Sequence, residues 1–405
     1  MAFSNIRSFA YRLKRAFLKK TAFIPYKGFR KFDLVIYDNI FPHPVSGFRL
    51  EEFKLLLKTF PNSKSILDPK AYGLVNTPKA AHQEHINSFT ALHQLQKKLQ
   101  VKKGLVNVNA KLFYCIFLNN IMDNLDWIEK FRIPFVFTLY PGGGFQMENE
   151  ESDAKLRKVL DSPMFRKAIV TQKITRDYLI DNKFCDAGDV LYIFGGIVPQ
   201  QIQKVEKFHK NYYGIDKKTF DICFCAAKYM PNGVDKGYDV FINAAHQLAQ
   251  KSGNVRFHVV GGFDENEIDV SKISDKIQFY GYRNFENLQE IYAQMDVIIS
   301  PNKPFLLAKG AFDGFPLGTV VEAAFNGVAA MVSDFLKQND VFAEEHELLV
   351  ISDAESIVLK VMDLIQDPEK LHRIAINGRQ KFLKIYSHDA QFPARLELLQ
   401  NEIKK

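Results

Sequence analysis

The chain has 405 residues, of which 47% are hydrophobic and 25% are charged, and its formal net charge at pH 7 is +8. This length exceeds one core of usual size and predicts two or three domains, while the composition excludes a disordered or fibrous protein. No apolar run reaches the ~18 residues that a membrane-spanning helix needs. The four cysteines are irregularly spaced, so we expect reduced thiols and a cytoplasmic protein.

The N-terminal segment, residues 1–31, contains nine basic residues and no acidic one. Apolar residues such as Phe9, Leu13 and Phe17 recur in it at helical spacing. This pattern is typical of a basic amphipathic helix on an anionic membrane surface, which would make the protein peripheral on the inner face of the cell membrane. A helix packed on its own domain explains the pattern equally well. Nucleic acid is not an expected partner, because no known binding motif accompanies the charge.

Residues 32–200 alternate between apolar runs and helical patterns, which predicts a parallel sheet covered on both faces. A helix is expected from 49 to 59, with further helices between the strands. His43 lies in the loop before it, between two prolines that also suggest a plain turn. Tyr140 precedes three glycines, including Gly143, which allow close backbone approach. We expect strands at 32–40, 64–67, 104–108, 135–139, 168–171 and 191–198.

A lysine stands at each end of the loop 228–236, between a predicted strand at 221–227 and an amphipathic helix at 237–251. Lys228 and Lys236 can clamp a diphosphate there, because ligands of open parallel sheets lie at the carboxyl ends of the strands. Either lysine alone is commonly a solvated surface charge.

The next pattern runs from a predicted strand at 296–300, through a loop that contains Asp313, into a helix at 319–326. Such an arrangement aims backbone N–H groups and the positive end of the helix dipole at an anion, most simply a phosphate. The N–H groups concerned are those of Gly318, Thr319 and Val320.

Glu322 has two interpretations. The run from Thr319 to Glu322 fits a capping box, in which the glutamate bonds its own helix start. Alternatively, Glu322 and Asp313 are two acids beside a phosphate site, which suits a ligand with both phosphates and hydroxyls. A nucleotide sugar is such a ligand.

Residues 221–390 resemble the donor-binding half of the retaining glycosyltransferases of the GT-B fold in the large GT4 family, glycosyltransferase group 1. The family's basic residue followed by Lys-Gly is matched by Lys228 and Lys236-Gly237. Its Ser-Pro, acid-Gly-Phe-Pro and Glu-Ala runs are matched by Ser300-Pro301, Asp313 to Pro316 and Glu322-Ala323.

The resemblance implies an α/β architecture of two Rossmann-like domains whose parallel sheets face each other across a cleft. Residues 32–200 would form the acceptor domain and 215–387 the donor domain, with 388–405 crossing back onto the first. The implied activity is a metal-independent, hexosyltransferase-like transfer, without any cofactor, from a nucleotide-diphosphate sugar to a glycan or lipid-linked acceptor in cell-surface polysaccharide synthesis.

The resemblance also implies three groups of site residues. Catalysis would depend on Lys228, Lys236, Asp313 and Tyr140. The donor would be bound by Gly318, Thr319, Val320, Glu322, Tyr282, Arg283 and Gly143. The acceptor would lie near His43, Ser46 and Gly47.

Two departures from the family pattern keep a second function open. Seven residues separate the family's paired glutamates, whereas eight separate Asp313 from Glu322, and Tyr140 stands where the family places a histidine. A tyrosine can donate a hydrogen bond but stays neutral at ordinary pH. The alternative is a catalytically degenerate nucleotide-sugar-binding subunit or scaffold of a transferase complex.

Overall fold

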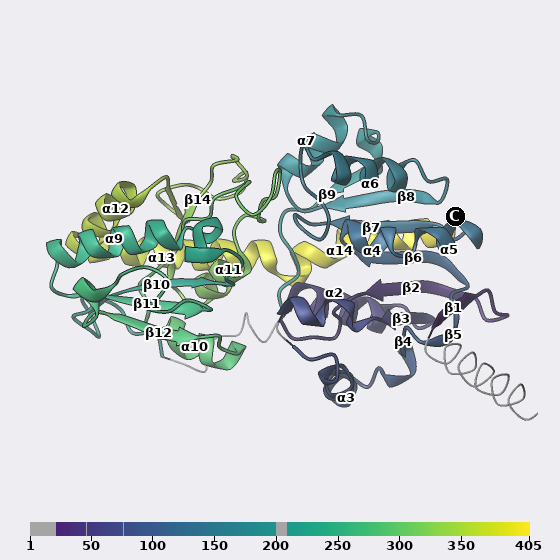
Figure 1. Cartoon of the computed structure of the whole chain (residues 1–405), viewed down its shortest axis with the longest axis horizontal. Coiled ribbons are helices and arrows are strands. Elements are labelled where there is room, and N and C mark those ends of the chain that lie inside the picture. The colour runs from purple at the N-terminus through teal and green to yellow at the C-terminus, as the bar shows by residue number, and fades with distance from the viewer. Residues whose placement is uncertain (1–21, 46, 76, 200–208) are drawn as a thin grey trace, which may run out of the picture.

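The computed structural model describes residues 22–45, 47–75, 77–199 and 209–405. These residues form two halves, each built around its own parallel β-sheet (Figure 1). The predicted architecture of two Rossmann-like halves is confirmed.

The N-terminal half contains a seven-stranded sheet in the order β4-β3-β2-β6-β7-β8-β9. Its central strands β6 and β7 are mainly apolar and buried except at Lys111, as expected for a parallel sheet covered on both faces. The strands are β2 Phe32–Asp38, β3 Ser63–Leu67, β4 Leu99–Val101, β6 Ala110–Ile116, β7 Phe135–Leu139, β8 Phe165–Val170 and β9 Val190–Tyr192. The helices are α2 Gly47–Thr59, α3 Ala81–His93, α4 Leu118–Met122, α5 Leu125–Lys130, α6 Glu150–Leu160 and α7 Lys173–Asp181, with short 3₁₀ turns η1 Pro69–Val75, η2 Gln96–Lys98 and η3 Ala187–Asp189.

The C-terminal half contains a six-stranded sheet in the order β12-β11-β10-β13-β14-β15. The strands are β10 Phe220–Ala226, β11 Val255–Gly261, β12 Ile277–Gly281, β13 Val297–Ser300, β14 Ala329–Ser333 and β15 Leu349–Ile351. The helices are α9 Tyr238–Lys251, α10 Phe285–Gln294, α11 Gly318–Phe325, α12 Ala354–Gln366 and α13 Pro368–Tyr386, with 3₁₀ turns η4 Pro231–Lys236 and η5 Ser271–Ile273.

The last helix, α14 His388–Lys404, crosses from the C-terminal half onto the N-terminal half, as Figure 1 shows in yellow. Its Gln391 side chain donates a hydrogen bond to the Phe194 carbonyl at 2.8 Å. Leu399 is fully buried in the cluster that contains Leu34 and Ile36 of β2. The predicted return of the C-terminal helix is therefore confirmed.

A loop of the C-terminal half makes a second contact with the N-terminal half. The N–H of Met147 donates to the Gly310 carbonyl at 2.9 Å, and the Phe312 and Phe145 rings pack edge to face at 5.9 Å. Gly310 has a φ of +74°, and a Cβ there would lie 1.7 Å from the Met147 carbonyl oxygen. Only glycine permits this approach of the two backbones.

Two strand predictions in the N-terminal half need correction. The predicted strand 104–108 forms β5 Gly104–Asn107, but β5 pairs with β1 Phe23–Tyr26 outside the main sheet. In the main sheet, β2 lies between β3 and β6. The sequence prediction missed β6 because a continuous apolar run does not show the alternation of apolar and polar residues that marks a strand. The predicted strand 191–198 ends at Tyr192, and the backbone turns at Gly195 with a φ of +80°.

The four cysteines are free thiols, as predicted, and Cys115, Cys223 and Cys225 are buried. Within the described ranges, no helix combines the length and the apolar composition needed to cross a membrane.

Leu399→Ala should destabilise the N-terminal half, although Leu399 lies near the C-terminus of the chain. Removing a fully buried leucine side chain costs about 2–5 kcal/mol. Trp127, the single tryptophan, lies in the N-terminal half, so urea unfolding followed by its fluorescence measures the effect. Leu359→Ala, at an exposed leucine of α12, is the matched control. An unchanged midpoint for Leu399→Ala would contradict the packing of α14.

Candidate functional site

A cavity of about 280 Å³ lies between the two halves, beside the carboxyl end of β10. Val45, Phe48 and Pro199 contribute from the N-terminal side, and Ala226, Tyr229 and Leu317 from the C-terminal side. Six predicted site residues line the same cavity: Gly47, Lys236, Asp313, Gly318, Thr319 and Glu322.

An ion pair between Lys236 and Asp313 forms one wall of the cavity. The Lys236 Nζ lies 2.6 Å from the Asp313 Oδ2, which also accepts a hydrogen bond from the Asn302 amide at 2.9 Å. Lys236 is only 4% exposed and its ammonium lies 5.0 Å from the centre of the Tyr229 ring. The next residue, Gly237, has a φ of +70°, and a Cβ there would lie 2.0 Å from the Pro301 carbonyl oxygen. Glycine is therefore required for the η4 turn to bring Lys236 against the loop after β13.

The start of α11 faces the cavity with unused donors. No described residue accepts a hydrogen bond from the N–H of Gly318 or of Thr319, which are the first two residues of the helix. The predicted third donor is already used, because the Val320 N–H donates to the Leu317 carbonyl at 3.0 Å and Val320 is fully buried. This helix start still offers two N–H groups and the positive end of its dipole to an anion.

The capping-box interpretation of Glu322 is wrong. The Thr319 hydroxyl donates to the Cys225 carbonyl at 2.8 Å, and no side chain caps the helix. The carboxylate of Glu322 lines the cavity, and no described residue forms a hydrogen bond or ion pair with it. Burial raises the pKa of the Glu322 carboxyl to about 7. An acceptor is therefore held in the cavity wall, where a hydroxyl of a ligand could donate to it.

A second cavity of about 170 Å³ adjoins the first, because Phe48, Leu317 and Gly318 line both. Tyr140 and Arg49 contribute to its N-terminal side. Burial raises the pKa of the Tyr140 hydroxyl, and the nearby Glu52 carboxylate raises it further. Tyr140 is thus neutral at ordinary pH, as its residue type predicts.

Lys228 does not line the larger cavity. Its ammonium pairs with the Glu267 carboxylate, which also accepts a hydrogen bond from the Asn232 N–H at 3.1 Å. The neighbouring residues Ala227 and Tyr229 do line the cavity, so the lysine backbone lies at the rim while its charge is neutralised by Glu267.

The remaining predicted donor residues lie outside both cavities. Gly143 lies behind the smaller one, where a Cβ would approach the Phe117 ring to 2.3 Å. Tyr282 is an exposed residue next to Gly262 at the end of β11, and Arg283 donates to the Tyr282 carbonyl at 3.1 Å.

Of the three predicted acceptor residues, one lines the larger cavity. Gly47 begins α2 and lines the larger cavity. Ser46 lies outside the described residues. His43 is buried, and its Nδ1 accepts from the Val45 N–H at 3.0 Å while its Nε2 lies 2.9 Å from the Thr77 hydroxyl. Burial, the charge of His85 and that of Arg49 lower the pKa of His43 to about 4. His43 therefore orders the loop that carries Val45 and is a neutral imidazole.

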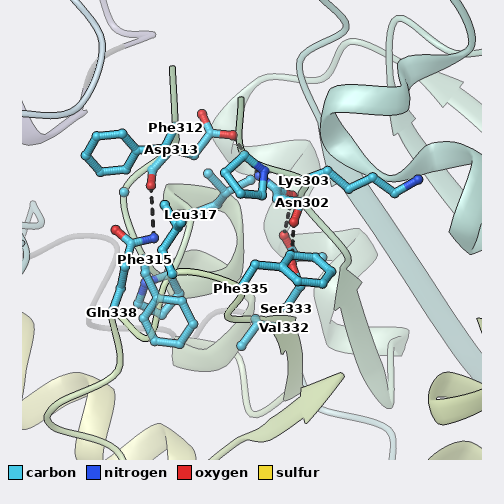
Figure 2. Close-up of a pocket in the computed structure, with 15 residues that line it drawn as sticks. Asn302, Lys303, Phe312, Asp313, Phe315, Leu317, Val332, Ser333, Phe335 and Gln338 are labelled. Atoms are coloured by element: carbon cyan, nitrogen blue, oxygen red, sulfur yellow. Dashed lines mark hydrogen bonds between the residues drawn. The ribbon is translucent and has the colours of Figure 1, made fainter. Parts of the chain in front are cut away.

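Hydrogen bonds from side chains at the end of β14 and in the segment after it fix the loop that carries Asp313, as Figure 2 shows. The Gln338 amide donates to the Asp313 carbonyl at 3.3 Å, and the Ser333 hydroxyl donates to the Asn302 carbonyl at 2.6 Å. The Asp313 carboxylate points away from Gln338 in this view. These contacts fix the loop without using the carboxylate.

Sequence reasoning missed Phe48, Tyr229, Glu267 and Asn302. Phe48 follows the predicted residue Gly47, and Tyr229 follows Lys228. The only indication of a role for either was that an aromatic residue stands next to a predicted site residue. Nothing in the sequence indicates the pairing of Glu267 with Lys228 across 39 residues. Within the described part of the chain, no three His, Cys, Asp or Glu residues gather as a possible metal site.

Residues 217–381, less than half of the chain, match the family described as Glycosyl transferases group 1. The C-terminal half is therefore similar to a glycosyltransferase group 1 domain. A comparison of the sequence with curated proteins gives no match.

Three solved structures show the same fold. HepE of Anabaena, in complex with UDP and glucose, is 14% identical with a TM-score of 0.64, over 91% of this chain and 100% of that one. Sucrose-phosphate synthase of Thermosynechococcus elongatus is 14% identical with a TM-score of 0.60, over 92% and 99%. TarM of S. aureus, in complex with Fondaparinux, alpha-GlcNAc-glycerol and UDP, is 12% identical with a TM-score of 0.56. That match covers 73% of this chain and only 56% of TarM. The fold is GT-B, as predicted.

Glu322→Gln should stabilise the protein at pH 8 and have little effect at pH 5. The unfolded chain releases this proton near pH 4.3 and the folded protein near pH 7, so the cost of the buried charge grows between these values and is complete above pH 7. Thermal unfolding should show a midpoint about 2–4 °C higher for the variant at pH 8. Glu290→Gln, at an exposed glutamate of α10, is the control. Equal midpoints of Glu322→Gln and the unaltered protein at pH 8 would contradict a raised pKa of the Glu322 carboxyl.

Proposed function

We propose that the protein is a retaining glycosyltransferase that moves a sugar from a nucleotide-diphosphate donor to a glycan or lipid-linked acceptor in cell-surface polysaccharide synthesis. The observation that carries this proposal is the cavity in which Lys236, the start of α11 and Glu322 meet. One cation and two unused N–H groups suit a pyrophosphate, and a carboxylate one helical turn away suits ribose hydroxyls.

The pyrophosphate would be held mainly by positive groups of the chain. When the bond between the anomeric carbon and the phosphate oxygen breaks, negative charge develops on the diphosphate. Lys236 and the N–H groups of Gly318 and Thr319 would stabilise it. Lys228 would add a second cation if the phosphate displaces it from Glu267. We therefore propose a reaction that needs no divalent metal, and EDTA should leave the rate unchanged.

The donor sugar would lie where the two cavities meet, near Leu317 and Gly318. Asp313 uses Oδ2 for Lys236 and Asn302, and no described residue bonds its Oδ1, so one oxygen is left for a sugar hydroxyl. The acceptor hydroxyl would approach through the smaller cavity, past Arg49 and Tyr140. It would bond the anomeric carbon, and its proton would pass to the departing diphosphate.

Removing the Lys236 ammonium should separate an enzyme from a scaffold. We expect purified protein to release nucleoside diphosphate slowly from a suitable donor, and UDP-hexoses come first because the HepE structure holds UDP and glucose. Lys236→Ala should lower kcat/KM for donor hydrolysis about 10²- to 10³-fold, because the developing charge loses its closest cation. The measurement is release of nucleoside diphosphate at fixed donor concentration.

Lys251→Ala, at an exposed lysine at the end of α9, is the matched control and should retain full activity. Thermal unfolding of Lys236→Ala shows whether the fold is kept, since the change leaves Asp313 without its ion-pair partner. Tight donor binding with no turnover in the unaltered protein, even with candidate acceptors, would contradict the enzyme and support the scaffold.

A further inference from the structure

The pair of strands β1 and β5 has one face that is partly exposed. Phe23 and Pro25 point inward, where Phe23 packs on Trp127 at 6.4 Å and the Pro25 partner Val106 is fully buried. Because side chains alternate along a strand, Ile24 and Tyr26 lie on the opposite face. Leu105, the register partner of Ile24, lies there too and is 68% exposed.

A turn extends this face with a fully exposed aromatic residue. The Asn107 side chain accepts a hydrogen bond from the Gly28 N–H at 2.9 Å and donates to the Arg30 carbonyl at 2.8 Å. Asn107 is the register partner of Tyr26, so the turn wraps over the outer side of β5. It holds Phe29 there without any burial of the ring. We call Ile24, Tyr26, Phe29 and Leu105 the β1–β5 face.

The charges that β1, β5 and their flanking turns carry are all positive, while two acids of neighbouring segments, Asp126 of α5 and Asp68, pair with Lys158 and Lys102. Neither segment 22–31 nor segment 102–109, which form it, contains an acid. Lys27 and Arg30 donate hydrogen bonds to the Phe131 carbonyl and the Asn62 amide oxygen, which are neutral acceptors that leave both charges in place. Lys31 and Lys103 are exposed as well. An exposed apolar surface with a cationic rim is complementary to an anionic lipid bilayer.

We propose that the β1–β5 face docks on the surface of an anionic membrane. Phe29 and Leu105 would enter the boundary between headgroups and acyl chains, and the rim cations would meet lipid phosphates. The face lies at the end of the N-terminal half that is turned away from the C-terminal half, so docking leaves the cavities open (Figure 1).

The test is co-sedimentation of the full chain with vesicles of phosphatidylcholine, with and without 30% phosphatidylserine, at physiological salt. The unaltered protein should bind the anionic vesicles and not the neutral ones. Phe29→Ser with Leu105→Ser should lower the partition coefficient about tenfold, and Lys31→Glu with Lys103→Glu at least as much. Leu359→Ser with Ile376→Ser, two exposed apolar residues of the C-terminal half, is the matched control and should bind normally.

Three outcomes would overturn the proposal. The unaltered protein could bind neutral and anionic vesicles equally, or Phe29→Ser with Leu105→Ser could bind like the unaltered protein. The third is a fall of several degrees in the thermal midpoint of that variant, since it would show that residues 1–21 cover the face. Donor hydrolysis, measured on the same variants, should stay unchanged, so the docking and the proposed transferase activity can fail separately.

Discussion

The ion pair between Lys236 and Asp313 is the contact on which the rest of the site depends. It joins the turn before α9 to the loop after β13, and it forms because Gly237 lets the turn approach the Pro301 carbonyl. The pair uses one donor of the ammonium and one oxygen of the carboxylate. The ammonium therefore keeps donors for a phosphate and the carboxylate keeps an oxygen for a hydroxyl.

The cavity also requires that the two halves stay together. The Gly310 backbone bonds Met147 on one side, and α14 packs under β2 on the other. Between these contacts, Phe48 of the N-terminal half lies close to Gly318, where an added Cβ would be 3.4 Å from its ring. The aromatic ring thus lies at the boundary between the larger and the smaller cavity, where the proposed reaction would bring a donor sugar to an acceptor.

Residues in the loops that follow two buried strands could be predicted from sequence. Lys236, Asp313 and Gly318 come after the apolar runs of β10 and β13, and the carboxyl ends of parallel strands share one edge of a sheet. Contacts between distant segments could not be predicted. Lys228 forms an ion pair with Glu267, which lies in the loop after β11. The strand β6 was missed because its apolar run does not alternate with polar residues. The Val320 N–H was predicted free because a sequence does not show that a helix starts with a tight turn.

A crystal structure with bound uridine diphosphate would test the central claim most directly. The account predicts that the pyrophosphate lies in the larger cavity, where one phosphate accepts hydrogen bonds from the N–H groups of Gly318 and Thr319. The Lys236 Nζ should lie about 3 Å from a phosphate oxygen, and Lys228 should have left Glu267 for the pyrophosphate. A pyrophosphate bound elsewhere, or one whose oxygens contact neither Lys236 nor the start of α11, would contradict the account.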